Sequence, residues 1–339
     1  MRKVFLYPIG EEASMSFYIR NSMNCLSGDF EFINRRSPSD LGIFNLIKYI
    51  FKVDYLFLNW VEDLPDKRGG VIQSVFFILS VYLSKLLRVK ILWVLHNKES
   101  HYSTNRLLKA FLFKFLIRKS NYILTHSREG LNYLDQYPAA RKRSTMYCPH
   151  PLEKKFIQQR KDPSIDFLIW GSIIPYKGID KFLELLYEFK LENRYRIVIA
   201  GKVQSSGYEE LISGYCNESI RLDNRFIPEN ELIRYLENTK TVLFTYVGNS
   251  VLSSGALMES LSFGVNILAP EVGAFRDTKD EGIIDTYKDY NELGQILQKG
   301  FVQPGNRRDS IESFIKANNW DQFSRKISDW LDLQGPITV

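Results

Sequence analysis

Cysteine is scarce in this chain: Cys25, Cys148 and Cys216 are the three cysteines among 339 residues. Because their number is odd and no C-x-x-C spacing occurs, the sequence encodes neither a disulfide framework nor a zinc site. The apolar content of 45% and the net charge of +6 also exclude a disordered chain. We therefore expect a globular protein of about two domains in a reducing compartment.

Long hydrophobic runs are missing as well. The longest, VIQSVFFILSVYLS, lies between Gly70 and Lys85 and is shorter than the roughly 20 residues that a membrane-spanning helix needs. We interpret it as a buried helix, with an interfacial helix as the alternative. The first residues, MRKVFLYPIGEEAS, contain too short an apolar stretch for a secretory leader. The sequence thus predicts a cytoplasmic protein.

Acidic residues are few in the first half of the chain. Residues 1–160 contain 25 lysines and arginines against 13 acidic residues, whereas residues 161–339 contain 20 against 26. A basic half indicates an anionic partner, which can be a membrane surface, a phosphorylated lipid or a nucleic acid. Within it, RLLKAFLFKFLIRK (106–119) is typical of a helix at a lipid interface, or of a core helix whose lysines reach solvent.

Both halves alternate short β-rich runs with helical patterns, which predicts parallel sheets covered on both faces. The helical patterns of the first half include residues 40–51, 71–86 and 103–119. The expected strands are 4–9, 31–34, 54–59, 90–95, 121–126 and 144–148 in the first half, and 165–170, 195–200, 219–222, 241–245 and 265–269 in the second.

Residues 149–164 contain three prolines and a charge cluster, a composition typical of an exposed linker. We predict an N-terminal domain over 1–150, a linker over 151–164 and a C-terminal domain over 165–318. The final segment, 319–339, is expected to be a helix that buries an aromatic stripe at spacings of three and four residues.

Loops at the ends of the second-half strands carry the features of an anion site. Gly171 and Ser172 follow one strand, and Lys177 follows six residues after the glycine, so that a phosphate could approach the backbone beside a cation. Ser253, Ser254 and Gly255 precede a helical run, whose first amides attract phosphate. An ordinary turn and a serine N-cap are the alternatives.

Four further residues of the second half belong to the same hypothesis. Glu259, one turn into that helix, is placed to accept hydrogen bonds from vicinal hydroxyls such as those of a ribose. Gly201 and Lys202 close another strand, and Ile227 lies in a loop that could support a nucleobase. Simple turn chemistry explains these loops equally well.

In the first half, the strand KILWVL ends in His96-Asn97 and is followed by His101. Two histidines at a strand's carboxyl end are candidates for proton transfer, and His96 is the candidate catalytic residue. His126 and His150 also follow strands, but no such group of polar residues accompanies them in sequence. The other strand-end candidates are Gly10, Glu11, Trp60, Glu62, Asp63 and Glu99, and the four carboxylates among them are alternatives for a general base.

Together these pieces resemble the GT-B glycosyltransferases, specifically family 4 and relatives that build bacterial surface polysaccharides. The resemblance covers nearly the whole chain and rests on the order of WGSIIPYKG (170–178), IVIAG (197–201), SSGALMESLSFGVNILAP (253–270), H-N-x-x-x-H (96–101) and Trp320. It implies two Rossmann-like, doubly wound domains facing a cleft, with the last helix crossing back to the first domain.

The resemblance also implies an activity. The second domain would bind a UDP- or GDP-sugar through Gly171, Ser172, Lys177 and the 253–255 turn, with Glu259 on the ribose, and without a metal or other cofactor. The first domain would bind a lipid-linked saccharide or oligosaccharide at the inner face of the membrane, with His96 against the transferred hexose. The usual first glutamate of a pair seven residues apart is Val251 here, and the usual arginine after the first glycine is Ser172.

Two other functions compete with this one. A nucleotide-sugar epimerase shares the architecture, but it has no need of the basic first half. A nucleic-acid binder would explain the charge of that half, but no recognisable motif supports it and the second half is acidic. We therefore expect a peripheral membrane glycosyltransferase that does not bind nucleic acid.

Overall fold

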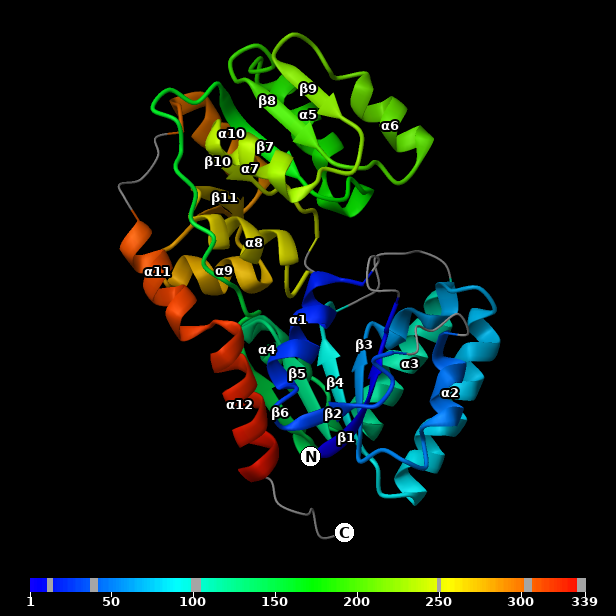
Figure 1. Ribbon diagram of the computed structural model, residues 1–339. Helices are drawn as coiled ribbons and strands as arrows, with labels where there is room; N and C mark the ends of the chain where they lie inside the picture. The colour runs from blue at the N-terminus through cyan, green and yellow to red at the C-terminus, as the bar shows by residue number, and fades with distance from the viewer. Residues whose placement is uncertain (11–14, 37–41, 99–104, 249–250, 302–306, 334–339) are drawn as a thin grey trace. The chain divides into compact units, whose positions relative to one another are not determined.

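The computed structural model describes residues 1–10, 15–36, 42–98, 105–248, 251–301 and 307–333. The chain forms two compact units, one of Met1–His150 with Asn318–Val339 and the other of Pro151–Ala317. Each unit contains a parallel sheet of six strands with helices around it (Figure 1). The α/β class predicted from the alternating patterns is confirmed.

The first unit is built on a sheet in the order β2-β1-β3-β4-β5-β6. Its central strands β3 and β4 are buried except at Lys90, the first residue of β4, which explains why they read as near-continuous apolar runs. The strands are β1 (Arg2–Tyr7), β2 (Phe30–Phe32), β3 (Tyr55–Asn59), β4 (Lys90–Leu95), β5 (Tyr122–Thr125) and β6 (Ser144–Tyr147).

Helices cover both faces of this sheet. They are α1 (Phe17–Leu26), α2 (Gly70–Leu86), α3 (Arg106–Lys119), α4 (Arg128–Asp135) and α12 (Trp320–Leu333), together with the 3-10 helices η1 (Gly42–Lys48), η2 (Val61–Asp66) and η3 (Ala140–Lys142). The pattern at 40–51 predicted a helix, and the described part of it is the shorter, tighter η1.

The last helix, α12, packs within the first unit, against α1. Phe323, Ile327 and Trp330 are buried in the same cluster as residues of β1 and β5, as their spacing indicates. Trp330 Nε1 donates to Ser144 Oγ at 2.8 Å, and Ser324 Oγ donates to the carbonyl oxygen of Cys25 at 2.8 Å. The core of the first unit is therefore completed by residues more than 150 positions away in sequence.

The second unit has the strand order β12-β11-β10-β7-β8-β9. The strands are β7 (Ile165–Trp170), β8 (Ile197–Ala200), β9 (Ile220–Asp223), β10 (Thr239–Leu243), β11 (Ile267–Pro270) and β12 (Asp285–Tyr287). The sequence patterns missed β12, because a three-residue edge strand with one buried residue carries no recognisable periodicity.

The helices of the second unit follow its strands in turn. They are η4 (Pro175–Lys177), α5 (Ile179–Glu188), α6 (Ser206–Ser213), α7 (Glu229–Glu237), α8 (Gly255–Phe263), α9 (Gly273–Asp280), α10 (Tyr290–Lys299) and α11 (Arg308–Ala317). Residues 151–164 lie extended along this unit, where the amide of Lys155 donates to Ser262 and that of Arg160 donates to Glu237.

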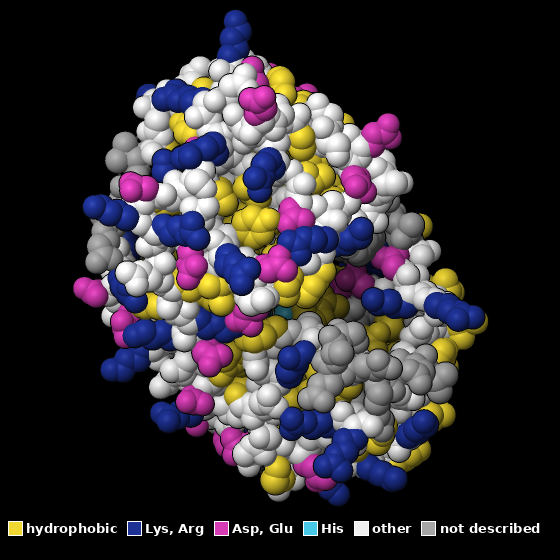
Figure 2. All heavy atoms as spheres, turned by 45° about the horizontal axis from the view of Figure 1, so that its top comes forward, with side chains coloured by type: hydrophobic (Ala, Val, Ile, Leu, Met, Phe, Trp, Pro, Cys, Tyr) yellow, Lys and Arg dark blue, Asp and Glu magenta, His cyan; other side chains and the backbone are white. Residues whose placement is uncertain are grey.

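Lysines and arginines are distributed over the surface, and hydrophobic side chains reach it between them (Figure 2). Within the described ranges, no helix is both long enough and apolar enough to traverse a bilayer.

Truncation of Ile327 tests the role of α12. The side chain is 1% exposed, so Ile327→Ala should lower the unfolding free energy of the first unit by about 2–5 kcal/mol. Leu333→Ala is the matched control on the same helix, because Leu333 is 85% exposed and its loss should cost less than about 0.5 kcal/mol. Urea unfolding followed by tryptophan fluorescence measures both, and equal stabilities would contradict the packing of α12.

Candidate functional site

Two glycines end the adjacent strands β7 and β8 of the second sheet, and their backbones touch. A Cβ atom at Gly201 would lie 1.8 Å from the carbonyl oxygen of Gly171, so no larger residue fits there. Gly171 itself has a φ of +96°, which residues with a side chain rarely adopt. Both strand ends therefore require a residue without a side chain at this point of the carboxyl edge.

Lys177 turns its side chain back onto the end of β7. Its Nζ donates to the carbonyl oxygen of Trp170 at 3.3 Å and lies 6.0 Å from the ring centroid of Tyr246. A Cβ atom at Gly171 would lie 3.1 Å from this Nζ. The side chain is buried, and this burial lowers the pKa of Lys177 to about 8. Both contacts are to neutral groups, so an anion bound here would offset the cost of burying the cation.

Tyr246 connects this lysine to the start of α8. While its ring faces Lys177, its hydroxyl lies 3.3 Å from Ser254 Oγ. The neighbouring Thr245 donates from Oγ1 to the carbonyl oxygen of Lys177 at 2.7 Å, which fixes the loop. The sequence analysis missed Tyr246, although a tyrosine directly after a buried strand is a signal for a polar group at the sheet edge.

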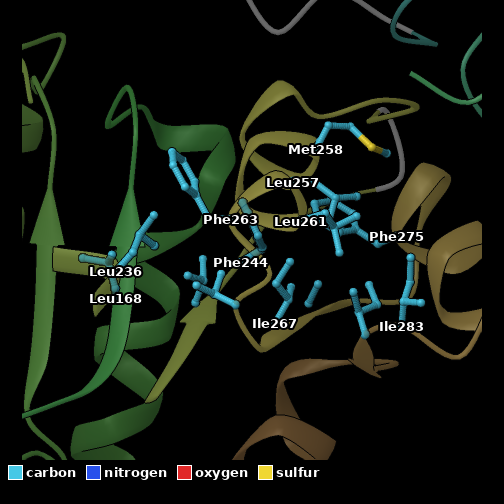
Figure 3. Close-up of a cluster of buried hydrophobic side chains, with 14 of the residues drawn as sticks. Leu168, Leu236, Phe244, Leu257, Met258, Leu261, Phe263, Ile267, Phe275 and Ile283 are labelled. Atoms are coloured by element: carbon cyan, nitrogen blue, oxygen red, sulfur yellow. The ribbon is translucent and has the colours of Figure 1, made fainter. Parts of the chain in front are cut away.

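The start of α8 has the geometry expected for an anion site. Ser254 is the N-cap and accepts a hydrogen bond from the amide of Leu257 at 3.2 Å, while the first amides of the helix have no intrahelical partner. Leu257 and Leu261 anchor the helix in the core together with Phe275 (Figure 3). The positive end of a rigid helix thus lies beside the tyrosine that contacts Lys177.

The remaining predicted residues of the second unit are held less firmly. Ser172 and Lys202 are exposed, whereas Ser253 and Glu259 are half-buried. Burial raises the pKa of the Glu259 carboxyl, an effect that Glu229 reinforces and Lys155 opposes. Gly255 is exposed at the first turn of α8, and Ile227 packs against the core of the unit. The contacts described above therefore join Gly171, Gly201, Lys177 and Ser254 most closely.

In the first unit, His96 directly follows β4 and is buried. Its Nε2 lies 3.0 Å from Oδ1 of Asn59, whose Nδ2 donates to the carbonyl oxygen of Tyr7 at 3.2 Å. This second hydrogen bond fixes which way the amide points, so His96 donates from Nε2 and its Nδ1 carries the lone pair. Trp60 stacks on the imidazole with ring centroids 4.2 Å apart and an angle of 15°.

Two more histidines accompany His96, against the prediction that they stand alone. The ring of His126 lies 5.6 Å from that of His96 and 5.2 Å from that of His150. Nδ1 of His126 donates to the carbonyl oxygen of Cys148 at 2.8 Å, and the hydroxyl of Tyr18 donates to Nε2 at 2.9 Å. The sequence could not show this, because each histidine ends a different strand or its connecting loop.

Burial governs the ionisation of this histidine cluster. It lowers the pKa of His126 to about 3 and the pKa of His96 well below its ordinary value, and nearby histidines add to both shifts. The rings of His96 and His126 are therefore neutral at physiological pH. Neutral imidazoles can accept a proton from a hydroxyl or donate a hydrogen bond to a substrate oxygen.

The other first-unit candidates occupy different environments. Gly10 and Asn97 are half-buried, while Glu11, Glu99 and His101 lie outside the described residues. Glu62 is buried and accepts a hydrogen bond from Trp93 Nε1 at 3.2 Å. Burial, together with the neighbouring Asp63, raises the pKa of Glu62 to about 8. Of the carboxylates considered as bases, Glu62 is thus protonated at neutral pH.

No group of three or more histidine, cysteine or acidic side chains in the described part of the chain is placed to hold a metal ion. A cavity of about 440 Å³ lies at the amino ends of β7, β8 and β9, and exposed arginines such as Arg196 and Arg234 line it. None of the predicted site residues contributes to this cavity, which lies at the edge of the sheet opposite to Lys177.

Comparison with solved structures shows which proteins share this fold. HepE from Anabaena, crystallised with UDP, has a TM-score of 0.70 at 11% sequence identity, and the match covers 98% of this chain and 100% of HepE. HepE has also been solved with UDP-glucose, with the same TM-score at 10% identity. A glycosyltransferase from Rickettsia africae gives 0.63 at 12% identity, with 98% of each chain covered.

These matches establish the GT-B fold for the chain, as the sequence analysis predicted. AviGT4, a glycosyltransferase of avilamycin A biosynthesis, matches with a TM-score of 0.58 at 11% identity over 98% of each chain. No protein-family model and no curated protein matches the sequence. The similarity is therefore one of fold, found through structure and not through sequence.

The histidine cluster predicts a stability that depends on pH. Because the folded-state pKa values of His96 and His126 are depressed, the unfolded chain binds more protons below about pH 6.5. The unfolding free energy should therefore fall as pH drops below 6.5, by up to about 1.4 kcal/mol per pH unit for each histidine. Urea unfolding at several pH values measures this slope, and His126→Asn should reduce it. If His126→Asn leaves the pH dependence of the unfolding free energy unchanged, the depressed pKa of His126 is contradicted.

The contact between the two glycines predicts a matched pair of variants. Gly201→Ala forces a Cβ atom into the carbonyl oxygen of Gly171 and should displace the end of β7. Gly207→Ala is the control, since a Cβ atom there meets nothing within 4 Å. We expect Gly201→Ala to lower the unfolding free energy of the second unit by more than about 1 kcal/mol, while Gly207→Ala changes it by less than about 1 kcal/mol. Equal unfolding free energies of the two variants in urea would contradict this close approach.

Proposed function

We propose that this protein is a family 4-like glycosyltransferase that moves a hexose from a UDP- or GDP-sugar onto a lipid-linked saccharide or oligosaccharide in bacterial surface polysaccharide biosynthesis. The reaction needs no metal or other cofactor. The enzyme works at the inner face of the cell membrane as a peripheral protein and does not act on nucleic acid. The observation that carries the proposal is the arrangement in which Tyr246 contacts both Lys177 and the N-cap of α8.

A diphosphate carries negative charge on two adjacent phosphoryl groups, and this arrangement offers two kinds of partner for it. Lys177 supplies a buried cation, and the start of α8 supplies backbone amides at the positive end of a helix dipole. Because both are fixed before the donor arrives, they stabilise the charge that develops on the leaving nucleotide. The known ligands of HepE, UDP and UDP-glucose, support a donor of this class.

In this proposal, the other residues that bind the donor surround Lys177 and the start of α8. Gly171 and Gly201 let the diphosphate approach the backbone, and Ser172, Lys202, Ser253 and Gly255 surround it with donors. Ile227 lies against the base. Glu259, one turn into α8, accepts hydrogen bonds from the ribose hydroxyls.

In the reaction, the bond between the anomeric carbon and the β-phosphate oxygen breaks, and the nucleotide leaves as a diphosphate. An acceptor hydroxyl forms the new glycosidic bond, and its proton passes to the leaving diphosphate. His96, held by Asn59 and Trp60, contacts the transferred sugar, and its unprotonated Nδ1 can accept a hydrogen bond from a hydroxyl. Gly10, Trp60 and Asn97 contribute to the acceptor side.

The assay that tests this proposal measures nucleotide release from UDP-glucose, other UDP-sugars and GDP-sugars, with and without a bacterial lipid extract. The proposal expects release that depends on the lipid extract, labelled sugar in the lipid fraction, and no loss of activity with EDTA. Interconversion of the free nucleotide-sugars without lipid would indicate an epimerase instead. Failure to bind any nucleoside diphosphate would refute both.

Lys177→Ala tests the central residue of the donor site. Loss of charge-assisted hydrogen bonds worth about 1.5–3 kcal/mol should raise the Kd for UDP roughly 10- to 100-fold and slow turnover. Lys181→Ala is the control, because this lysine is exposed on α5 and pairs with Glu184. In the unsubstituted enzyme, UDP binding should weaken as pH rises through about 8, where Lys177 loses its proton. If UDP binding by the Lys177→Ala variant shows the same pH dependence, Lys177 does not belong to the donor site.

A further inference from the structure

The helix α2 exposes six of its apolar residues to solvent. We call this set the α2 face: Val71, Ile72, Val75, Leu79, Tyr82 and Leu86, each more than half exposed. Their spacing of three and four residues places them on one stripe of the helix. Such a stripe is normally buried, and contiguous exposed apolar surface marks a place where a protein meets a partner or a membrane.

The side of α2 that packs against the sheet mixes apolar and small polar residues. Phe77 and Val81 are fully buried there. Ser74 and Ser84 are fully buried as well, and their hydroxyls bond to carbonyl oxygens one turn earlier, at 2.7 and 2.8 Å. The α2 helix therefore carries apolar side chains on its exposed side as well as on its buried side. The sequence analysis predicted a buried helix here, and the structure shows that only one side of it is buried.

The neighbouring α3 extends this surface. The ring centroid of its Phe115 lies 5.8 Å from that of Tyr82, and Phe111 stacks on Phe115. Leu107 and Phe111 are exposed, and Lys114 and Arg118 continue the same stripe of α3. The α3 surface therefore changes from apolar near its start to cationic near its end.

Cations surround the α2 face, and acidic residues are almost absent near it in sequence. Between residues 67 and 128 the chain contains twelve lysines and arginines and one acidic residue, Glu99. Lys119 Nζ lies 4.5 Å from the ring centroid of Tyr82, and the exposed Lys67, Arg68 and Arg88 flank the two ends of α2. Hydrophobic and basic side chains lie together on the side of the first unit where α2 and α3 are drawn (Figures 1 and 2).

We infer that the α2 face, with the exposed residues of α3, is the surface on which this protein docks to an anionic lipid bilayer. Apolar side chains that enter the acyl boundary, combined with cations that attract anionic headgroups, are the two components of interfacial binding. A second copy of the chain is a poorer occupant, because a two-fold contact through this face would bring two sets of cations together. The cations around the α2 face therefore favour an anionic partner, and its apolar residues favour a lipid bilayer.

This inference deepens the proposed function, since it names the surface that brings the enzyme to a lipid-linked acceptor. Both α2 and α3 begin at the carboxyl edge of the first sheet, because each follows a strand of a parallel βαβ unit. Their apolar residues nearest that edge, Val71, Ile72, Leu107 and Phe111, thus lie on the same edge of the sheet as His96. An acceptor anchored in the bilayer reaches this edge without leaving its membrane.

Co-sedimentation with vesicles tests the inference. Vesicles of phosphatidylcholine with about a third phosphatidylglycerol should bind the protein, and vesicles of pure phosphatidylcholine should bind it less, with binding to the former weakened by salt. Leu79→Glu should lower the affinity for the anionic vesicles at least about tenfold. Leu211→Glu on α6 is the matched control, because Leu211 is an exposed leucine of the second unit and its replacement should change nothing.

Calorimetry with UDP on the same variants separates this inference from the proposed function. Vesicle binding that Leu79→Glu abolishes while UDP binding stays intact supports the inference, and it does so even if the protein transfers no sugar. Equal vesicle binding by Leu79→Glu and the unsubstituted protein overturns the inference. A lipid-free dimer in sedimentation velocity that Leu79→Glu dissociates also overturns it, in favour of a second copy. Circular dichroism of each variant confirms that the helix content is unchanged.

Discussion

The proposed chemistry depends on one buried cation that is held against an open backbone. Lys177 lies over the end of β7, where two glycines leave no side chain, and Tyr246 joins it to the first turn of α8. A buried lysine loses its hydration and gains only contacts with neutral groups here. An anion therefore binds more favourably beside Lys177 than beside an exposed lysine. The remainder of the second unit keeps this lysine, the glycine pair and the helix end in place.

The two units use the carboxyl ends of their strands in different ways. In the second unit these ends present a cation and helix amides, which suits a diphosphate. In the first unit they present neutral imidazoles, an indole and a protonated carboxyl, which suits hydroxyls of a sugar. The shared GT-B architecture thus supplies two edges of different chemical character, and in our proposal the exposed apolar stripe of α2 adds a surface for the membrane that holds the acceptor.

Local sequence patterns were sufficient for the architecture but insufficient for the details of the site. Strands buried on both faces and glycines after them leave strong signals, so eleven of the strands and the loops at Gly171 and Ser254 were predicted correctly. Tyr246 contacts Lys177, and His126 and His150 lie near His96, but these residues follow different strands. Hydrophobic periodicity along the sequence does not predict such contacts. For α2 the sequence favoured a buried helix over an interfacial one, because hydrophobicity alone does not tell which side of a helix meets the protein.

The position of a bound nucleoside diphosphate is the most direct measurement of the central claim. In a crystal structure with UDP, the account predicts that the diphosphate lies within hydrogen-bonding distance of Lys177 Nζ and of the first amides of α8. UDP bound elsewhere, for instance among the arginines at the amino ends of β7 and β8, with the surroundings of Lys177 unchanged, would contradict it.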